Sequence, residues 1–190
     1  LDPAIPSDNV SFQYIDSIYE GLYRVGQGGN IESGVAIKDE TEVSEDGLTY
    51  TFHLREDAKW SNGDPVTAHD FVYGWQRAID PETKSFYADY LMSGNIVNAA
   101  EVYAGDVAPE ELGVTAVDDY TFEVQLVKPV PYFDSIAAFP TFMPLNEEFV
   151  EAQGEDFALE VDTMIYNGPF SLTEWDSGTN GSWVLSRNDQ

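Results

Sequence analysis

The stretch from Tyr50 to Arg77 reads YTFHLREDAKWSNGDPVTAHDFVYGWQR and contains the signals of a strand, a turn and a helix start. Polar and bulky residues alternate from Thr49 to Leu54, which predicts a strand with one buried face. The following SNGDP segment, Ser61–Pro65, favours a tight reversal. Thr67 offers a hydroxyl N-cap with a carboxylate three residues later, and apolar residues then recur at helical spacing. We therefore predict a strand that leads into an amphipathic helix over 68–79.

Similar patterns predict the elements on either side of this stretch. Helices are expected at 10–22, 87–92, 96–104, 130–138 and 146–153, the last capped by Asn146. Strands are expected at 42–43, 114–117, 120–126, 170–175 and 183–186, with turns at 26–30 and 178–181. The order of these elements is mixed rather than regularly alternating, which predicts an α/β fold of the mixed α+β kind.

Composition restricts the function without identifying it. The 190 residues are 43% hydrophobic and 14% aromatic, enough for a folded core in one domain or slightly more. Eight basic residues against 35 acidic ones give a formal charge of −27, and the basic residues are scattered, so nucleic acid is a poor partner. The absence of cysteine excludes disulfides, thiolate metal sites and a cysteine nucleophile, and no apolar run approaches the length of a membrane span.

Short motifs run in a fixed order over nearly the whole chain. They are Leu1–Pro3 (LDP), Tyr19–Tyr23 (YEGLY), Gly34–Ala36 (GVA), Asp46–Arg55 (DGLTYTFHLR), Trp60–Val72 (WSNGDPVTAHDFV), Asp80–Pro81 (DP), Tyr120–Leu126 (YTFEVQL), Pro129–Phe133 (PVPYF) and Asn167–Phe170 (NGPF). Each motif alone is weak, because several are ordinary turns. Together, their order and spacing resemble the extracellular solute-binding proteins of family 5, the oligopeptide and dipeptide receptors of ABC transporters, and most closely the oligopeptide branch.

This resemblance implies a fold and a domain organisation. Family members have the class C periplasmic-binding-protein fold, are more than twice this length and bind ligand between two lobes. We therefore expect an N-terminal fragment that holds part of the first lobe, with the second lobe absent. Residues 1–37 and 161–190 would form an incomplete ligand-gripping subdomain, and residues 38–160 the inserted subdomain typical of this class.

The resemblance also implies a function. The chain would belong to the substrate-binding component of an ABC importer, which is not an enzyme, needs no cofactor or metal, and delivers oligopeptides to a membrane permease. It would work outside the cytoplasmic membrane as a monomer, either as a cell-surface lipoprotein or in a periplasm. A receptor that accepts many peptides must hold the main chain as an added strand, leave hydrated room for side chains, and close and reopen for release.

Five residues are the expected peptide contacts. Ala4 and Ile5 follow the LDP motif, in the loop where family members pair with the peptide main chain. Tyr87 matches a tyrosine that faces the ligand, although a half-buried surface aromatic would fit the pattern equally well. Asn167 and Gly168 match the return strand near the cleft and hinge, where a structural turn is the competing interpretation. The acidic group that captures the peptide amino terminus would lie in the second lobe.

Other functions fit parts of the sequence less well. Related receptors take dipeptides, signalling peptides, nickel complexes or sugars, and an interaction protein without a transport role is a further alternative. His53 and His69 lack a third ligand at helical or hairpin spacing, which disfavours a metal site. The tryptophans and many carboxylates could suggest a glycosidase, but no acid pair stands out, and Trp60 and Trp75 are better explained as core residues.

Overall fold

The computed structural model describes residues 1–6, 8–176 and 181–189. The helices of this part of the chain are α1 (Asn9–Ile18), α2 (Ala68–Ile79), α3 (Ala99–Tyr103), α4 (Phe133–Ala137) and α5 (Glu147–Gln153), joined in places by single helical turns. The strands are β1 (Tyr23–Val25), β2 (Ile31–Ser33), β3 (Glu42–Val43), β4 (Thr49–His53), β5 (Val114–Asp118), β6 (Thr121–Gln125), β7 (Phe170–Trp175) and β8 (Trp183–Arg187). They pair as β1–β2, β3–β4–β6–β5 and β7–β8, and every pairing is antiparallel.

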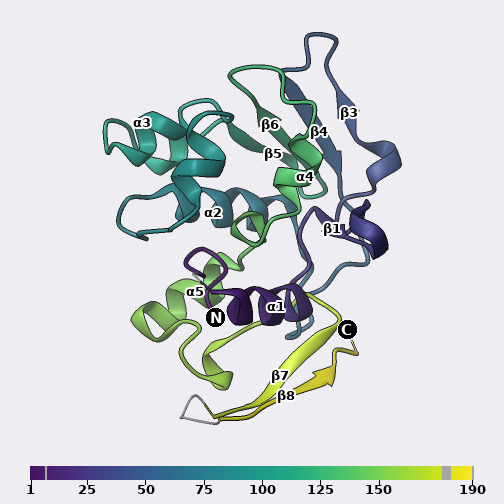
Figure 1. Ribbon diagram of the computed structural model, residues 1–190, viewed down its shortest axis with the longest axis vertical. Coiled ribbons are helices and arrows are strands. Elements are labelled where there is room, and N and C mark those ends of the chain that lie inside the picture. Colours follow the sequence, from purple (N-terminus) through teal and green to yellow (C-terminus); the bar gives the residue numbers. More distant parts are fainter. Residues whose placement is uncertain (7, 177–180, 190) are drawn as a thin grey trace.

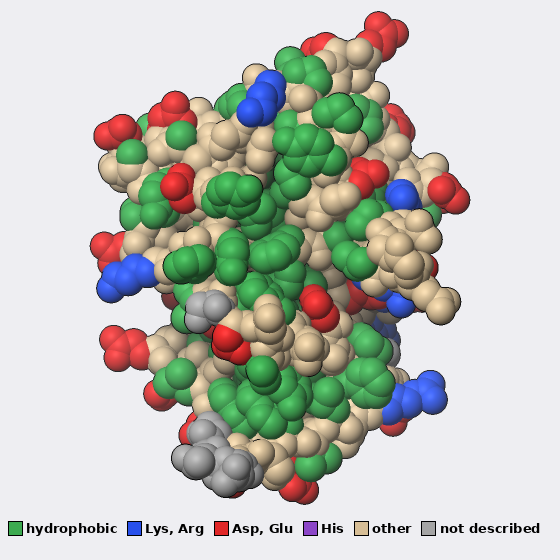
Figure 2. All heavy atoms as spheres, viewed as in Figure 1, with side chains coloured by type: hydrophobic (Ala, Val, Ile, Leu, Met, Phe, Trp, Pro, Cys, Tyr) green, Lys and Arg blue, Asp and Glu red, His purple; other side chains and the backbone are tan. Residues whose placement is uncertain are grey.

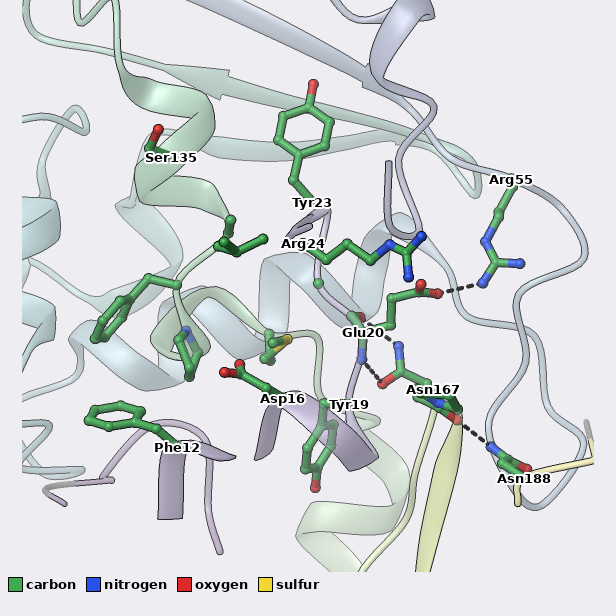
Figure 3. Close-up of a pocket in the computed structure, with 18 residues that line it drawn as sticks. Phe12, Asp16, Tyr19, Glu20, Tyr23, Arg24, Arg55, Ser135, Asn167 and Asn188 are labelled. Atoms are coloured by element: carbon green, nitrogen blue, oxygen red, sulfur yellow. Dashed lines mark hydrogen bonds and ion pairs between the residues drawn. The ribbon is translucent and has the colours of Figure 1, made fainter. Parts of the chain in front are cut away.

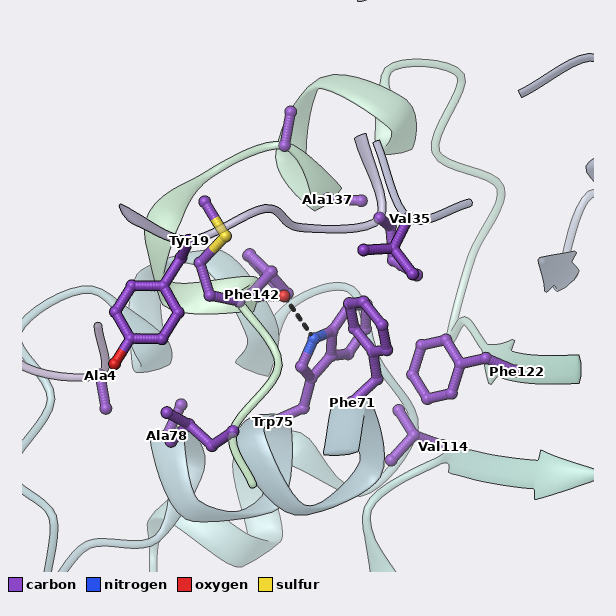
Figure 4. Packing of buried hydrophobic residues seen from close by; sticks show 14 of the residues in the cluster. Ala4, Tyr19, Val35, Phe71, Trp75, Ala78, Val114, Phe122, Ala137 and Phe142 are labelled. Atoms are coloured by element: carbon purple, nitrogen blue, oxygen red, sulfur yellow. Dashed lines mark hydrogen bonds between the residues drawn. The ribbon is translucent and has the colours of Figure 1, made fainter. Parts of the chain in front are cut away.

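The four-stranded sheet and α2 form the main core. In β4, Tyr50 and Phe52 point to the buried side and pair with Val124 and Phe122 of β6, so the predicted strand with one buried face is confirmed. Trp75 of α2 packs edge-on against Phe122 with ring centroids 5.0 Å apart, and its Nε1 donates a hydrogen bond to the Phe142 carbonyl at 2.9 Å (Figure 4). This core is aromatic, and the indole N–H of Trp75 has its acceptor inside it.

The start of α2 has the predicted capping arrangement. The Thr67 backbone N–H donates to Asp70 Oδ2 at 2.7 Å, and the Thr67 hydroxyl donates to the same oxygen at 3.2 Å. The helix then runs over the predicted residues and ends at Ile79, before the Asp80–Pro81 pair. At Gly74, an added Cβ would lie 2.6 Å from the Met143 carbonyl oxygen, so only glycine lets α2 approach that segment so closely.

The β7–β8 hairpin lies beside α1, on the other side of α1 from the four-stranded sheet (Figure 1). Tyr14 of α1 stacks on Trp183 of β8 at 4.0 Å, and Trp183 stacks in turn on Trp175 of β7 at 4.8 Å. The predicted pairing of these strands is confirmed. Of the predicted turn at 178–181, residues 178–180 lie outside the described residues.

Several predicted helices are shorter than expected. The helix predicted for 10–22 ends at Ile18, because Tyr19 adopts extended backbone and the residues after it hydrogen-bond to other segments; Val35 N–H, for example, donates to the Gly21 carbonyl at 2.9 Å. The helix predicted for 130–138 is reduced to α4. The stretches at 87–92 and 96–104 become a π-helical turn at Asp89–Ser93 and the short α3. Tertiary hydrogen bonds override local helical periodicity at these ends.

On the face shown in Figure 2, hydrophobic side chains gather across the middle and at the lower end, and acidic side chains are spread around the rim. Within the described ranges, no helix is both long and apolar enough to cross a membrane. The division into residues 1–37 plus 161–190 and residues 38–160 stays a prediction. Trp60 and Trp75 are fully buried, as predicted for core residues.

Candidate functional site

A cleft of about 550 Å³ lies where the C-terminal half of α1 meets β1 and the segment before β7 (Figure 3). Segments far apart in the sequence line it, and both predicted subdomains contribute to it. The lining residues are Phe12, Asp16, Tyr19, Glu20, Gly21, Tyr23, Arg24, Val25, Arg55, Ser135, Ala138, Phe139, Pro140, Met143, Asn167, Gly168, Pro169 and Asn188.

Asn167 and Gly168 join α1 to the segment before β7. The Asn167 side chain accepts a hydrogen bond from Glu20 N–H at 3.0 Å and donates one to the Glu20 carbonyl at 2.8 Å, as a neighbouring strand would. Gly168 N–H donates to the Ile18 carbonyl at 2.9 Å. A Cβ on Gly168 would lie 2.6 Å from the Ile18 carbonyl carbon and 2.7 Å from the Tyr19 nitrogen. These two residues therefore fix the position of the chain at Glu20, which forms one wall of the cleft.

The cations that line the cleft are paired within the chain. Arg55 Nη2 lies 2.5 Å from Glu20 Oε2, and Arg55 Nη1 lies 3.2 Å from Asp57. Arg24 Nη2 lies 3.1 Å from Glu32, and its Nε donates to the Ser33 carbonyl at 3.2 Å. Asp16 differs, because burial raises the pKa of its carboxyl and no other group contributes to that shift. The lining of the cleft thus contains two arginines that form ion pairs and one acid, Asp16, without a partner among the described residues.

An aromatic wall borders the same cleft. Phe12 and Phe139 line the cleft, with ring centroids 5.3 Å apart in an edge-to-face arrangement. Tyr87 packs behind them, 5.6 Å from Phe12 and 5.2 Å from Phe139. Phe86 continues the cluster at 5.1 Å from Tyr87 and is 72% exposed. Partly exposed rings of this kind offer apolar surface to a ligand at little conformational cost.

The structure separates the five predicted contact residues into two groups. Asn167 and Gly168 line the cleft. Tyr87 does not line it, but packs against Phe12 and Phe139, which do. Ala4 is buried, with its N–H bonded to Asp2 Oδ1 at 2.9 Å and its carbonyl accepting from Ser85 Oγ at 2.5 Å. Ile5 is half exposed and lines a different pocket, of about 350 Å³, together with Arg77 and Phe157. That any of the five contacts a peptide stays a prediction.

Sequence reasoning missed three lining residues with distinctive chemistry: Asp16, Phe12 and Arg55. Asp16 could have been noticed, because it lies four residues after Phe12 and so interrupts the edge of an apolar helix face. Arg55 carries no such signal, since its role depends on Glu20, 35 residues away in sequence. Pairings of that kind are visible only in the folded chain.

The arrangement is suited to binding. It offers aromatic surface and the carboxylate of Asp16, which has no partner among the described residues. His53 lies 3.3 Å from Glu42 and His69 lies 3.5 Å from Asp119, in both cases away from the cleft. Among the described residues, no group of three or more histidine, aspartate or glutamate side chains could hold a metal ion.

Comparisons with known proteins agree with the motifs. Residues 31–190 match the family model described as bacterial extracellular solute-binding proteins, family 5 middle. The oligopeptide-binding protein OppA of Bacillus subtilis is 43% identical over 190 residues, which cover 100% of this chain and 34% of that protein. The dipeptide-binding protein of Lactococcus lactis is 40% identical over 191 residues, which cover 99% of this chain and 34% of that protein.

A solved structure shows the same fold. OppA of Listeria monocytogenes bound to peptide superimposes with a TM-score of 0.93 and 48% sequence identity, covering 99% of this chain and 36% of that one. The chain thus spans about a third of the length of the relatives it matches. The family match over most of the chain agrees with the relatives and with the fold. The chain belongs to the bacterial extracellular solute-binding proteins of family 5.

Proposed function

We propose that this chain forms one wall of the ligand cleft in the substrate-binding component of an ABC importer, and that the ligand is an oligopeptide. The observation that carries the proposal is the cleft between α1, β1 and the Asn167–Pro169 segment, found in a chain of this family. Similarity to an oligopeptide-binding protein and to a peptide-bound structure supports the choice of ligand. The proposed role is binding and release, without catalysis.

The cleft has the mixed character that peptide binding needs. A peptide main chain needs backbone or amide partners, and its side chains need room and some apolar surface. Polar side chains line the cleft at Asp16, Ser135 and Asn188, while Phe12 and Phe139 carry the apolar surface. Opposing groups would come from a second lobe that closes over the ligand, as in a two-lobed trap.

The remaining expectations form part of this proposal. The protein would act outside the cytoplasmic membrane, in a periplasm or tethered to the cell surface by a lipid, and would dock as a monomer on a membrane permease. Residues 1–37 and 161–190 would grip the ligand, and residues 38–160 would form the inserted subdomain. Ala4, Ile5, Tyr87, Asn167 and Gly168 remain the proposed contacts.

Calorimetric titration tests the proposal. The full-length protein is purified under denaturing conditions to remove carried ligand, refolded, and titrated with a pool of tripeptides to hexapeptides. We expect saturable heat with this pool and none with free amino acids or sugars. A dipeptide pool is titrated in parallel, because one relative is a dipeptide-binding protein. Heat with dipeptides or a sugar, and silence with the longer peptides, would overturn the proposed ligand.

A matched pair of variants tests the position of the site. Tyr87→Ala removes the ring behind Phe12 and Phe139, and we expect it to weaken peptide binding by about tenfold through loss of apolar and ring contacts. Tyr103→Ala removes a more exposed tyrosine on α3, which does not line the cleft. Equal effects of the two variants would argue against the cleft assignment.

A further inference from the structure

Asp16 is the one acid that lines the cleft without a partner among the described residues. It projects from α1 into the cleft, one helical turn beyond Phe12 (Figure 3). The other lining carboxylate, Glu20, is held by Arg55 at 2.5 Å. No hydrogen bond or ion pair within the described ranges involves the Asp16 carboxylate. Its charge is therefore available to something outside this part of the chain.

Asp16 is exposed in this chain, although neighbouring atoms of the cleft partly desolvate its carboxyl. This desolvation raises the pKa of the carboxyl, and no cation among the described residues counteracts the shift. A carboxylate that is partly removed from water gains most from a positively charged hydrogen-bond donor. When a ligand and a second lobe exclude more water, the need for such a donor becomes stronger.

The two arginines that line the cleft form ion pairs with acids other than Asp16. Arg55 is shared between Glu20 and Asp57, at 2.5 Å and 3.2 Å. Arg24 is held by Glu32 at 3.1 Å and by a backbone carbonyl. Neither arginine forms an ion pair with Asp16 in this structure. Asp16 is therefore the one lining acid that no cation among the described residues pairs with.

The aromatic wall next to Asp16 defines the shape of the missing partner. Phe12 is on the same face of α1, and Phe139 packs on Phe12 at 5.3 Å. A lysine or arginine side chain fits such a place, because its aliphatic stem packs on apolar rings while its charged head reaches an acid at the end. A peptide ammonium group has the same charge without the stem.

We propose that Asp16 binds a positively charged side chain of the ligand, so that the receptor prefers peptides carrying a lysine or arginine at the Phe12–Phe139 wall. This inference rests on the proposed peptide-binding function and adds a ligand preference to it. Asp16 thereby acts as a specificity-determining residue.

Calorimetry on the full-length protein tests the inference with alanine tetrapeptides that carry one lysine at each position in turn. Norleucine at the same position keeps the stem and removes the charge, and N-acetylation removes the ammonium group. With the unmodified protein we expect the best lysine peptide to bind about tenfold more tightly than its norleucine match. N-acetylation of both peptides should leave this ratio unchanged, and a ratio that disappears on N-acetylation would contradict the inference.

Three variants complete the design. Asp16→Asn should bring that ratio close to one. Asp16→Lys should reverse the preference toward peptides with glutamate in place of lysine. Asp106→Asn removes the charge of an exposed aspartate that does not line the cleft, and it should keep the full tenfold ratio.

The outcomes separate the two proposals. If peptides bind but charged and neutral matches bind equally, Asp16 selects nothing and this inference fails alone. If Asp16→Asn weakens every peptide by the same factor, Asp16 pairs with a group of the protein and the inference again fails alone. If no peptide binds the unmodified protein, the proposed function fails and the inference fails with it.

Discussion

The sheet–helix core and the cleft wall are built from similar residues but are completed in different ways. In the core, Phe52, Phe122 and Trp75 are fully buried, and the Trp75 indole N–H has its acceptor within the chain. In the cleft wall, Phe12 and Phe139 are half exposed and Asp16 has no partner among the described residues. The core uses its contacts for stability, whereas the cleft wall keeps apolar surface and charge available for a ligand.

The largest difference should appear when one ring is removed from each region. Trp75→Ala should lower the free energy of unfolding by about 3–5 kcal/mol, because it leaves a large cavity between α2 and the sheet. Phe12→Ala should cost only about 1–2 kcal/mol, since that ring is half exposed. Urea unfolding of both variants measures the difference. Equal costs in unfolding free energy would show that Phe12 is packed as tightly as Trp75.

A second contrast concerns the buried acid of the core. Burial raises the pKa of Asp70 to about 6, although hydrogen bonds from Thr67 favour the charged form. This folded-state pKa lies above the ordinary value of 3.8, so the folded state holds the proton more tightly. The stabilisation is complete below pH 4 and is lost as the pH rises through 6, by about 3 kcal/mol in total.

Asp70→Asn tests this pH dependence while keeping an oxygen that can accept from Thr67. The free energy of unfolding of the unmodified protein, minus that of the variant, should fall by about 3 kcal/mol between pH 4 and pH 7. Urea unfolding at several pH values gives this difference. A difference that stays constant over the range would mean that Asp70 does not carry the buried charge.

Gly168 tests the close approach that positions the cleft wall. An added Cβ would press on backbone atoms of Ile18 and Tyr19, which cannot move aside as a flexible side chain could. Gly168→Ala should therefore cost about 2–3 kcal/mol of unfolding free energy. Gly94→Ala is the matched control, because a Cβ there meets nothing within 4 Å; it should change stability by less than about 0.5 kcal/mol. Similar effects of the two substitutions would rule out the close packing at Gly168.

Asn167 tests whether the wall depends on a side chain that imitates a strand. Asn167→Ala removes the bonds to both backbone groups of Glu20 and should cost about 2 kcal/mol. Asn167→Asp keeps the acceptor for Glu20 N–H but turns a carboxylate oxygen toward the Glu20 carbonyl at a buried site, so it should cost at least as much as Asn167→Ala. Urea unfolding of the two variants ranks them. An alanine variant as stable as the unmodified protein would show that the two bonds to Glu20 contribute little.

The same comparison explains what the sequence could predict. The strand at 49–53, the helix at 68–79 and the hairpin at 114–125 follow from periodicity and capping, which are local signals. The end of α1 does not, because the bond from Gly168 N–H to the Ile18 carbonyl joins residues 150 positions apart. Asp16 and Arg55 could not be predicted as cleft residues either, because the cleft forms only when distant segments come together. Asn167 and Gly168 were found through family motifs rather than through local physics.

Hydrogen–deuterium exchange of the full-length protein, with and without a saturating peptide pool, tests the central claim most directly. If the cleft wall is the ligand site, amide exchange should slow at residues 16–25 and at Asn167 and Gly168 when peptide is bound. The exposed loop at 105–113, which does not line the cleft, should exchange at the same rate in both states. Unchanged exchange in the cleft wall under saturating peptide, or protection confined to other surfaces of this chain, would contradict the account.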